Sequence, residues 1–214
     1  MATYIIVAVI AYLIGSVNFS IIISKKMAGF DIREKGSGNA GTTNMLRSVG
    51  KKAAVITLIC DILKGVVAVL IAVLAGKIIK NLDNALLVQL AGIFVIVGHT
   101  FPIFFGFKGG KGIACTTGVI LAFHWQMAPL CIGLFIVVVL LTQYVSLGSI
   151  LLVSVFFIEL LLFGQTGHLP VADTYLPEIY VLGGIFTLMA IWRHRANIKR
   201  LLSGTENKLW GGKK

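Results

Sequence analysis

The sequence predicts an all-α integral membrane protein, built as one compact bundle of about seven transmembrane helices. Of its 214 residues, 57% are hydrophobic and only 13% are charged, whereas charged residues make up about a quarter of an average soluble domain. Long apolar runs alternate with short polar segments, a pattern typical of helices that cross a bilayer. Because no linker or low-complexity stretch divides the chain, residues 1–214 are expected to form a single domain.

The first apolar run, Tyr4–Ile23, is long enough to cross a bilayer as one helix, because its twenty residues carry no charge. The polar segment that follows, 25–52, has seven Lys or Arg residues against two acidic ones. Basic loops stay on the cytoplasmic side, which predicts an N-terminus on the outside. A second span covers Ala53–Gly76, where Asp61 and Lys64 share a helix face and can pair.

The third span, Ala85–Phe107, returns the chain to the cytoplasmic side at Lys108–Gly112, whose sequence is KGGKG. Glycine lets a ligand approach the backbone and lysine adds a positive charge, so this turn is a candidate anion site. A flexible basic turn is the alternative. The glycine spacing differs from that of a P-loop, and no hydroxyl residue follows the lysine, so a nucleotide-hydrolysing site is not expected.

The next region is almost uncharged, and two polar breaks define its helices. A turn at 123–129 combines aromatic residues with a proline, and a second break covers 142–149. The predicted spans between them are two short runs, Ile113–Phe123 and Leu130–Leu141, and a longer one, Ile150–Phe163. The short runs would need tilt, burial in the bundle or local thinning of the bilayer.

The last span, Ile179–Trp192, leads into a tail, 193–214, with seven Lys or Arg residues against one acidic residue. This tail is predicted to be cytoplasmic, so the number of spans must be odd, and seven fits the apolar runs best. Apolar residues recur with helical spacing in the tail, which predicts a short helix with His194 and Asn197 on one face.

The net charge of +11 lies mostly in segments that flank apolar spans, so membrane orientation and an anionic ligand explain it better than a nucleic acid. Cys60, Cys115 and Cys131 show no C-x-x-C spacing, and neither a disulfide framework nor a metal site is predicted. The sequence also lacks a nucleophile elbow and a zinc-helix motif. No metal or other cofactor is therefore expected.

Polar segments predicted on the cytoplasmic side are rich in glycine, hydroxyl, amide or cationic side chains, which are the groups that hold phosphate oxygens. These segments are Gly36–Arg47 within 25–52, then 108–112, 142–149 and 193–214. Alternatives remain for individual residues. Gly36–Asn44 could instead be a flexible loop, and Asp61 and Lys64 could instead form a structural ion pair. For His99, a structural histidine held by a hydrogen bond is the favoured interpretation.

Motifs in four places carry a family resemblance. They are G-S-G-N-x-G-x-x-N-x-x-R at Gly36–Arg47, D-x-x-K-G at Asp61–Gly65, H-x-F-P-x-F with G-G-K-G at His99–Gly112, and H-x-x-N-I-x-R-L-x-x-G-x-E at His194–Glu206. In these motifs the chain resembles the bacterial membrane-integral acyl-phosphate:glycerol-3-phosphate acyltransferases, the PlsY family. Ala40, Thr42 and Cys115 depart from the residues common in that family, which puts loop stiffness in question rather than activity.

The resemblance implies transfer of a fatty acyl group from acyl phosphate to the 1-hydroxyl of sn-glycerol 3-phosphate. The products would be lysophosphatidic acid and phosphate, in the first acylation step of phospholipid synthesis. It also implies a multi-pass protein of the bacterial cytoplasmic (inner) membrane, with the active site facing the cytoplasm and no cofactor. The competing function is a small transporter or channel for phosphorylated solutes or anions. A third possible function is that of a non-catalytic assembly subunit.

Residue types and the resemblance together suggest a role for each site residue. The donor phosphate is expected to be held by Ser37, Gly38, Asn39, Gly41, Thr43, Asn44 and the backbone of Gly109, Gly110 and Gly112. Glycerol 3-phosphate is expected to be held by Arg47, Lys111, Ser146, His194 and Asn197. Lys64 would lie near either phosphate, oriented by Asp61, and Glu206 would fix the tail helix. The base is either His194 or the donor phosphate itself, and the predicted catalytic set is His194, Lys111, Ser37 and Arg47.

Overall fold

The computed structural model describes residues 2–79, 82–169 and 171–210, and these residues form helices and connections without a strand. Residues 80–81 and 170, which lie between predicted spans, and the end of the predicted tail, 211–214, lie outside the described residues. The described chain contains six helical segments that are long and apolar enough to cross a membrane, and Ile113–Phe123 is a shorter apolar helix. The predicted all-α membrane fold with about seven spans is confirmed.

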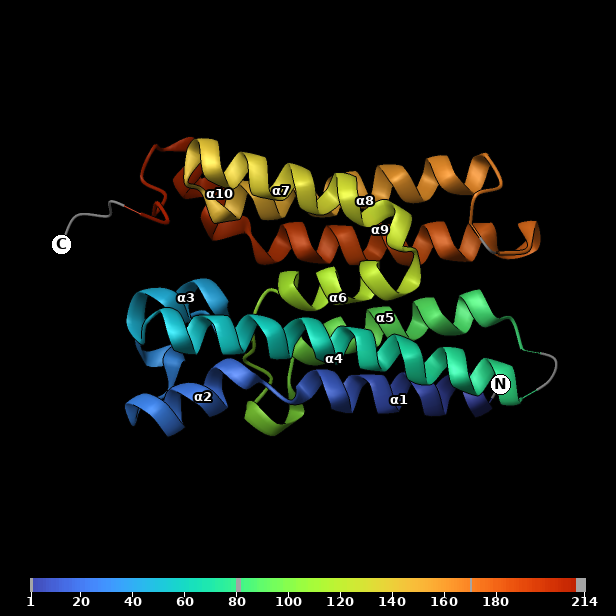
Figure 1. Cartoon of the computed structure of the whole chain (residues 1–214), viewed down its shortest axis with the longest axis horizontal. Coiled ribbons are helices and arrows are strands. Elements are labelled where there is room, and N and C mark those ends of the chain that lie inside the picture. Colours follow the sequence, from blue (N-terminus) through green and yellow to red (C-terminus); the bar gives the residue numbers. More distant parts are fainter. Residues whose placement is uncertain (1, 80–81, 170, 211–214) are drawn as a thin grey trace. The chain divides into compact units, whose positions relative to one another are not determined.

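The chain divides into two compact units, residues 1–123 and 124–214, and each is described by itself. The first unit contains α1 (Ala2–Ser16), α2 (Phe19–Ala28), η1 (Ile32–Glu34), α3 (Thr42–Ser48), α4 (Lys51–Ile78), α5 (Asn84–Thr100), η2 (Ile103–Phe105) and α6 (Ile113–Phe123). Within it, α5 packs against α1 and α4, and α6 packs against α4 (Figure 1).

The first apolar run, Tyr4–Ile23, is two helices rather than the single helix that was predicted. The side-chain oxygen of Asn18 accepts a backbone N–H from the first turn of α2 at 3.3 Å, which makes Asn18 the N-cap of a new helix. At the end of α1, the Lys64 ammonium donates to the carbonyl oxygens of Gly15 (3.1 Å) and Val17 (2.9 Å). The break is therefore stabilised on both sides by polar side chains, which hydropathy alone does not detect.

Glycines allow the helices of this unit to pack with their backbones in contact. A Cβ on Gly98 of α5 would overlap the carbonyl oxygen of Tyr12 in α1. A Cβ on Gly118 of α6 would likewise overlap the carbonyl oxygen of Ile62 in α4. Small residues at such positions are how membrane helices gain packing contacts that lipid cannot provide.

Replacing Gly98 by Ala is expected to destabilise the protein, because the methyl group meets rigid backbone and the two helices must separate. Overpacking of this kind costs about 2 kcal/mol, which corresponds to a fall of roughly 4–8 °C in the midpoint of thermal unfolding. Gly133→Ala in α7 (Ala128–Thr142) is the matched control, since a Cβ there has no neighbouring atom within 4 Å. Equal midpoints for the two variants in detergent would contradict this account of the packing.

The second unit contains η3 (Trp125–Met127), α7, α8 (Val145–Gln165), η4 (Asp173–Tyr175), α9 (Leu176–Arg193) and α10 (Arg195–Leu202). In this unit α8 packs against α7 and α9, and α10 contacts both α8 and α9. The predicted tail helix is confirmed as α10. The predicted run Leu130–Leu141 was too short, because η3 and α7 together form an apolar segment of 18 residues. The predicted break at 142–149 is reduced to Gln143 and Tyr144, since Gln143 adopts φ 64° and ends α7.

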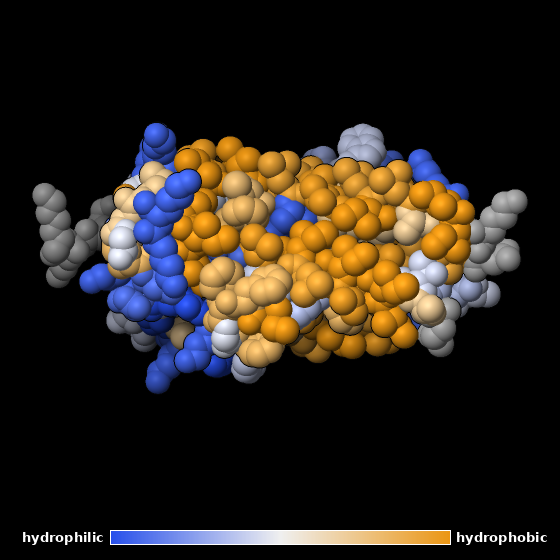
Figure 2. All heavy atoms as spheres, turned by 90° about the horizontal axis from the view of Figure 1, so that it is seen from below, coloured by the Kyte–Doolittle hydropathy of each residue, from blue (hydrophilic) through white to orange (hydrophobic). Residues whose placement is uncertain are grey.

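Large apolar side chains remain exposed along the first unit, as expected of a surface that faces lipid rather than water. They include Ile5, Ile6 and Val9 on α1 and Ile59 and Leu63 on α4. Figure 2 shows that hydrophobic residues cover the middle of the viewed face and that hydrophilic residues gather toward the end that carries α2 and α3 in Figure 1. The segment that carries α3 therefore lies at the polar end of this unit.

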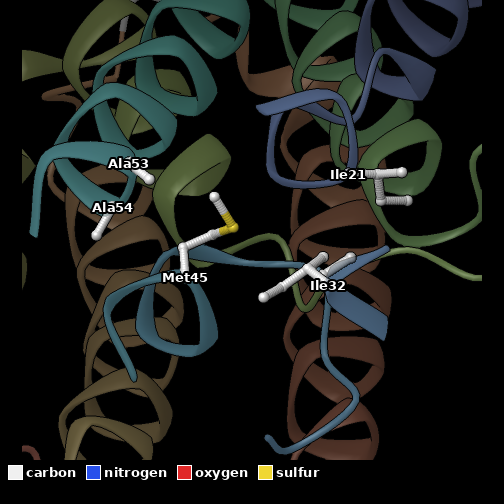
Figure 3. Close-up of a cluster of buried hydrophobic side chains, with 6 residues drawn as sticks. Ile21, Ile32, Met45, Ala53 and Ala54 are labelled. Atoms are coloured by element: carbon white, nitrogen blue, oxygen red, sulfur yellow. The ribbon is translucent and has the colours of Figure 1, made fainter. Parts of the chain in front are cut away.

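A small hydrophobic cluster anchors this polar end of the first unit. Ile21 of α2, Ile32 of η1, Met45 of α3 and Ala53 and Ala54 of α4 are buried together (Figure 3). Because these residues come from four successive elements, the cluster holds the segment between α2 and α4 against both helices. The chain on both sides of the glycine-rich motif is therefore anchored by buried side chains.

Candidate active site

The first glycine-rich segment is organised by one buried amide, that of Asn44 in α3. Its Oδ1 accepts the backbone N–H of Ser37 at 3.0 Å. Its Nδ2 faces three carbonyl oxygens, those of Ile32 (3.1 Å), Lys35 (2.9 Å) and Asn39 (3.1 Å). A segment with this set of hydrogen bonds is an ordered loop, so the alternative of a flexible loop is not supported.

These bonds change the role expected for Asn44. Its side chain is 1% exposed and its amide bonds within the loop, so Asn44 shapes the segment. Gly36, with φ 58°, leaves room for it, because a Cβ there would overlap Asn44 Oδ1. Ser37 and Gly38 are exposed on the outer side of the same loop, where a ligand can reach them.

The glycine-lysine turn folds back on the end of α5. The N–H of Gly109 donates to Thr100 O and the N–H of Gly110 donates to His99 O, both at 3.1 Å. These two N–H groups are therefore used within the protein, and the role of this backbone in holding a phosphate stays a prediction. The glycines also serve close packing, since a Cβ on Gly109 would overlap the carbonyl oxygen of His99.

Arg33, which the sequence did not single out, joins the two glycine-rich segments of the first unit. Its Nη1 donates to the carbonyl oxygens of Phe105 (2.7 Å) and Lys108 (3.1 Å). Its Nε and Nη2 donate to the two carboxylate oxygens of Asp31 at 2.9 and 2.8 Å. The available signal was an acid and an arginine two residues apart beside the motif. The guanidinium fork holds the turn Lys108–Gly112 beside the segment that precedes Gly36–Arg47.

Hydrogen bonds from Arg33 lower the pKa of the Asp31 carboxyl from 3.8 to about 2, and Lys25 at 3.3 Å contributes further. Because the folded state lowers this pKa, the carboxylate stabilises folding above pH 3.8, and the effect is lost as the pH falls through about 2. Asp31→Asn is expected to cost about 2 kcal/mol at neutral pH. The difference from wild type should disappear toward pH 2.

Thermal unfolding in detergent across this pH range measures the effect. Glu34→Gln is the matched control, because Glu34 is exposed on the same turn and makes no ion pair with Arg33 among those that the structure records. A deficit in Asp31→Asn that is equally large at neutral and acid pH would contradict the assigned role of the charge.

The predicted pairing of Asp61 with Lys64 is confirmed, with a distance of 2.9 Å between Asp61 Oδ1 and Lys64 Nζ. The ammonium also lies 2.9 Å from His99 Nδ1 and bonds to the carbonyls of Gly15 and Val17. An ammonium has three N–H groups, and four protein acceptors surround this one. The geometry therefore supports the structural alternative for Lys64, not the predicted contact with a substrate phosphate.

In the second unit, Ser146 and His194 are both buried. Ser146 lies in the first turn of α8, and its Oγ has no hydrogen-bond partner among the described residues. His194 lies between α9 and α10 and is 1% exposed, with Nδ1 2.8 Å from the carbonyl oxygen of Ala190. That contact requires a proton on Nδ1, so a neutral His194 ring carries its lone pair on Nε2.

Glu206 fixes the tail helix, as predicted. Its two carboxylate oxygens accept hydrogen bonds from Asn197 Nδ2 and Arg200 Nε, each at 2.8 Å. The N–H of Leu209 then donates to the carbonyl oxygen of Gln143 at 2.8 Å, which joins the tail to the turn between α7 and α8. Two of the predicted polar segments thus meet within the second unit.

The remaining predicted residues lie at differing depths around these contacts. Arg47 is exposed on α3. Gly112, with φ 85°, is buried just before α6 begins. The partly buried residues are Asn39, Gly41, Thr43 and Lys111. Within the first unit the structure brings Gly36–Arg47 and Lys108–Gly112 together, and within the second it joins 142–149 to His194–Glu206.

Comparison with known proteins agrees with the resemblance seen in the motifs. A family model described as glycerol-3-phosphate acyltransferase matches residues 5–204. The chain is 44% identical to the glycerol-3-phosphate acyltransferase of Clostridioides difficile (strain 630), over 97% of this chain and 96% of that protein. It is 46% identical to the Halalkalibacterium halodurans enzyme of the same name, over 93% of this chain and 92% of that protein.

Two crystal structures of PlsY, an integral membrane glycerol 3-phosphate acyltransferase, have the same fold. The glycerol 3-phosphate form has a TM-score of 0.81 at 36% identity, and the lysophosphatidic acid form has 0.79 at 34%. Both alignments cover 96% of this chain and 94% of the PlsY chain. The helical membrane fold, the glycine-rich segments and these similarities together show that the chain belongs to the PlsY family of membrane-integral glycerol-3-phosphate acyltransferases.

Proposed function

We propose that the protein acylates glycerol 3-phosphate with acyl phosphate as the donor. In this reaction the 1-hydroxyl oxygen attacks the acyl carbon, a new ester bond forms, and the bond from the acyl carbon to the phosphate oxygen breaks. The hydroxyl proton passes to a base, and the products are lysophosphatidic acid and inorganic phosphate. Because an acyl phosphate is already activated, the protein chiefly has to orient two phosphorylated substrates and offset their charge.

The observation that carries the proposal is the joining of two glycine-rich segments in the first unit. Arg33 bonds to the backbone of Lys108, and Asn44 orders the loop that presents Ser37, so the protein's own hydrogen bonds hold these segments in place. Arg47 and Lys111 add two positive charges to this end of the unit. A hydrogen bond to a charged group contributes about 1.5–3 kcal/mol, so a few such donors suffice for useful affinity.

Within the first unit, the exposed loop is proposed to hold the donor phosphate through Ser37, Gly38, Asn39, Gly41 and Thr43. Lys111 and Arg47 are proposed to bind glycerol 3-phosphate. In the second unit, Ser146, His194 and Asn197 are proposed to contact glycerol 3-phosphate. The buried, unpartnered Ser146 hydroxyl and the Nε2 lone pair of a neutral His194 ring support these assignments.

The active site is proposed to face the cytoplasm of a bacterial inner membrane. The basic segments 25–52 and 193–214 support this orientation, because Lys and Arg are retained on the cytoplasmic side. A transporter or channel is the weaker candidate. It rested on the spans, the basic cytoplasmic segments and the intramembrane pair Asp61 and Lys64. In the structure this pair bonds to itself, to His99 and to the carbonyl oxygen of Gly15.

The test supplies purified protein with glycerol 3-phosphate and either palmitoyl phosphate or palmitoyl-CoA. We expect phosphate and lysophosphatidic acid in equal amounts from palmitoyl phosphate, and no acylation from palmitoyl-CoA. Free phosphate can be followed by a colorimetric assay and the lipid by mass spectrometry.

Lys111→Ala serves as the low-activity control when glycerol 3-phosphate is supplied well below the wild-type KM, because a raised KM then lowers the rate. Phosphate release that does not exceed this control would overturn the proposal, and so would efficient acylation from palmitoyl-CoA. Release of phosphate without lysophosphatidic acid would identify a hydrolase instead.

A further inference from the structure

The first unit contains a buried ionic network that the proposed chemistry does not use. It consists of Asp61 and Lys64 of α4 and His99 of α5, which are 1%, 5% and 3% exposed. The Lys64 ammonium lies 2.9 Å from both Asp61 Oδ1 and His99 Nδ1, and Asp61 Oδ1 lies 3.5 Å from His99 Nδ1. Ionisable side chains in an apolar span are costly, so a network of three calls for a function.

The network determines which nitrogen of His99 carries the proton. The ammonium of Lys64 can only donate, so a nitrogen 2.9 Å from it must accept. A proton on Nδ1 would point toward a positively charged donor at 2.9 Å, whereas Asp61 Oδ1 lies at the longer distance of 3.5 Å. In a neutral ring the proton therefore sits on Nε2.

The other side of the His99 ring lies against the two glycine-rich segments. A Cβ on Gly110 would overlap both His99 Nε2 and the carbonyl oxygen of Ala40, so these atoms border the same small space. The carbonyl oxygen of His99 also accepts the N–H of Gly110 at 3.1 Å. His99 thus contacts the glycine-lysine turn through both its ring and its backbone, next to the loop that contains Ala40.

We propose that Asp61, Lys64 and His99 form a positioning network for the two glycine-rich segments. The Asp61–Lys64 pair holds His99 in the tautomer with Nε2–H, which presents a donor beside the Ala40 carbonyl and packs against Gly110. In this way the network fixes the position of Lys111, which follows Gly110 in the chain, relative to the loop that contains Ser37. His99 is a positioning residue and takes no part in the bond changes. The predicted effect of His99 on enzyme kinetics rests on the proposed function. The tautomer of His99 and the ordering of the glycine-rich segments do not depend on that function.

Two substitutions of similar size distinguish the contribution of His99 Nδ1 from that of His99 Nε2. Asn at position 99 can place an oxygen near the Nδ1 position and so satisfy Lys64, but it does not reach the glycine-rich segments. Gln at position 99 can place an N–H near the Nε2 position, and Lys64 then keeps three acceptors: Asp61, Gly15 O and Val17 O. His99→Asn should raise the KM for glycerol 3-phosphate about tenfold with a smaller change in kcat, whereas His99→Gln should stay within about threefold.

His168→Asn is the matched control, because His168 is exposed and its recorded ring contacts are with Thr166 and Phe163. Equal losses in the two His99 variants, or a larger loss in His99→Gln, would overturn the proposal. Hydrogen exchange of the peptide covering Lys108–Gly112 should be faster in His99→Asn than in wild type, and unchanged exchange would also overturn it.

Nitrogen NMR of protein labelled at its four histidines tests the tautomer without any assay of activity. The His99 signal is identified by its absence from the His99→Asn spectrum. We expect a protonated Nε2 and an unprotonated Nδ1. The opposite tautomer, or a doubly protonated ring, would overturn the proposal even in an active enzyme. Failure of acyl transfer in wild type would instead overturn the proposed function alone.

Discussion

Alanine in place of Lys111 is expected to raise the KM for glycerol 3-phosphate by roughly 10- to 100-fold, the effect of losing one charged hydrogen bond. The backbone on both sides of Lys111 is held, since Gly110 N–H bonds to His99 O and Gly112 O accepts the N–H of Thr116 at 2.7 Å. The substitution therefore removes the ammonium and leaves both of these backbone hydrogen bonds in place. Because the phosphate of glycerol 3-phosphate does not react, its binding should be lost equally from ground state and transition state, and kcat should change little.

Lys108→Ala is the matched control for this prediction. It removes the same charge three residues earlier in the same turn, where the side chain is exposed and the backbone carbonyl oxygen accepts a hydrogen bond from Arg33. Its KM should remain within about threefold of wild type. If both variants lose affinity equally, the turn acts through its general positive field, and a specific contact by Lys111 is contradicted.

Hydropathy predicted most of the fold because the length of an apolar run determines whether a helix crosses a bilayer. It failed where a polar side chain ends a helix inside such a run. Tyr4–Ile23 contains no charge and no proline, yet it breaks before Asn18 because that side chain caps α2. The carbonyls left at the end of α1 are satisfied by Lys64, which is remote in sequence and becomes a neighbour only through helix packing.

The residues of the candidate site could be identified from motifs, but their orientation could not. Asn44 and the backbone of Gly109 and Gly110 were expected to hold a phosphate, and in the structure the Asn44 amide and the two glycine N–H groups bond within the protein. A sequence motif shows which residues can donate hydrogen bonds, but the tertiary structure determines which acceptors these donors contact. Glu206 was predicted correctly, because an acid close in sequence to Asn197 and Arg200 can meet them through local folding alone.

Replacing His194 by Ala is expected to lower kcat by about 10²–10⁴, the usual contribution of a general base. Its Nδ1 contact with Ala190 O places the lone pair of a neutral ring on Nε2, the atom that would accept the proton of the substrate hydroxyl. The alternative base is the donor phosphate. In that case His194 only binds glycerol 3-phosphate, and the same substitution should raise KM while kcat is largely kept.

His194→Asn separates the chemistry of the ring from its structural bond. The Asn amide can reproduce the N–H that donates to the Ala190 carbonyl, which preserves the junction of α9 and α10, but it supplies no basic nitrogen at the Nε2 position. If His194 is the base, kcat should fall in both variants, while His168→Ala, an exposed histidine of the same unit, should leave kcat unchanged. A His194→Asn enzyme that keeps its kcat and has a raised KM would assign proton removal to the donor phosphate, because binding would then be the whole contribution of the histidine.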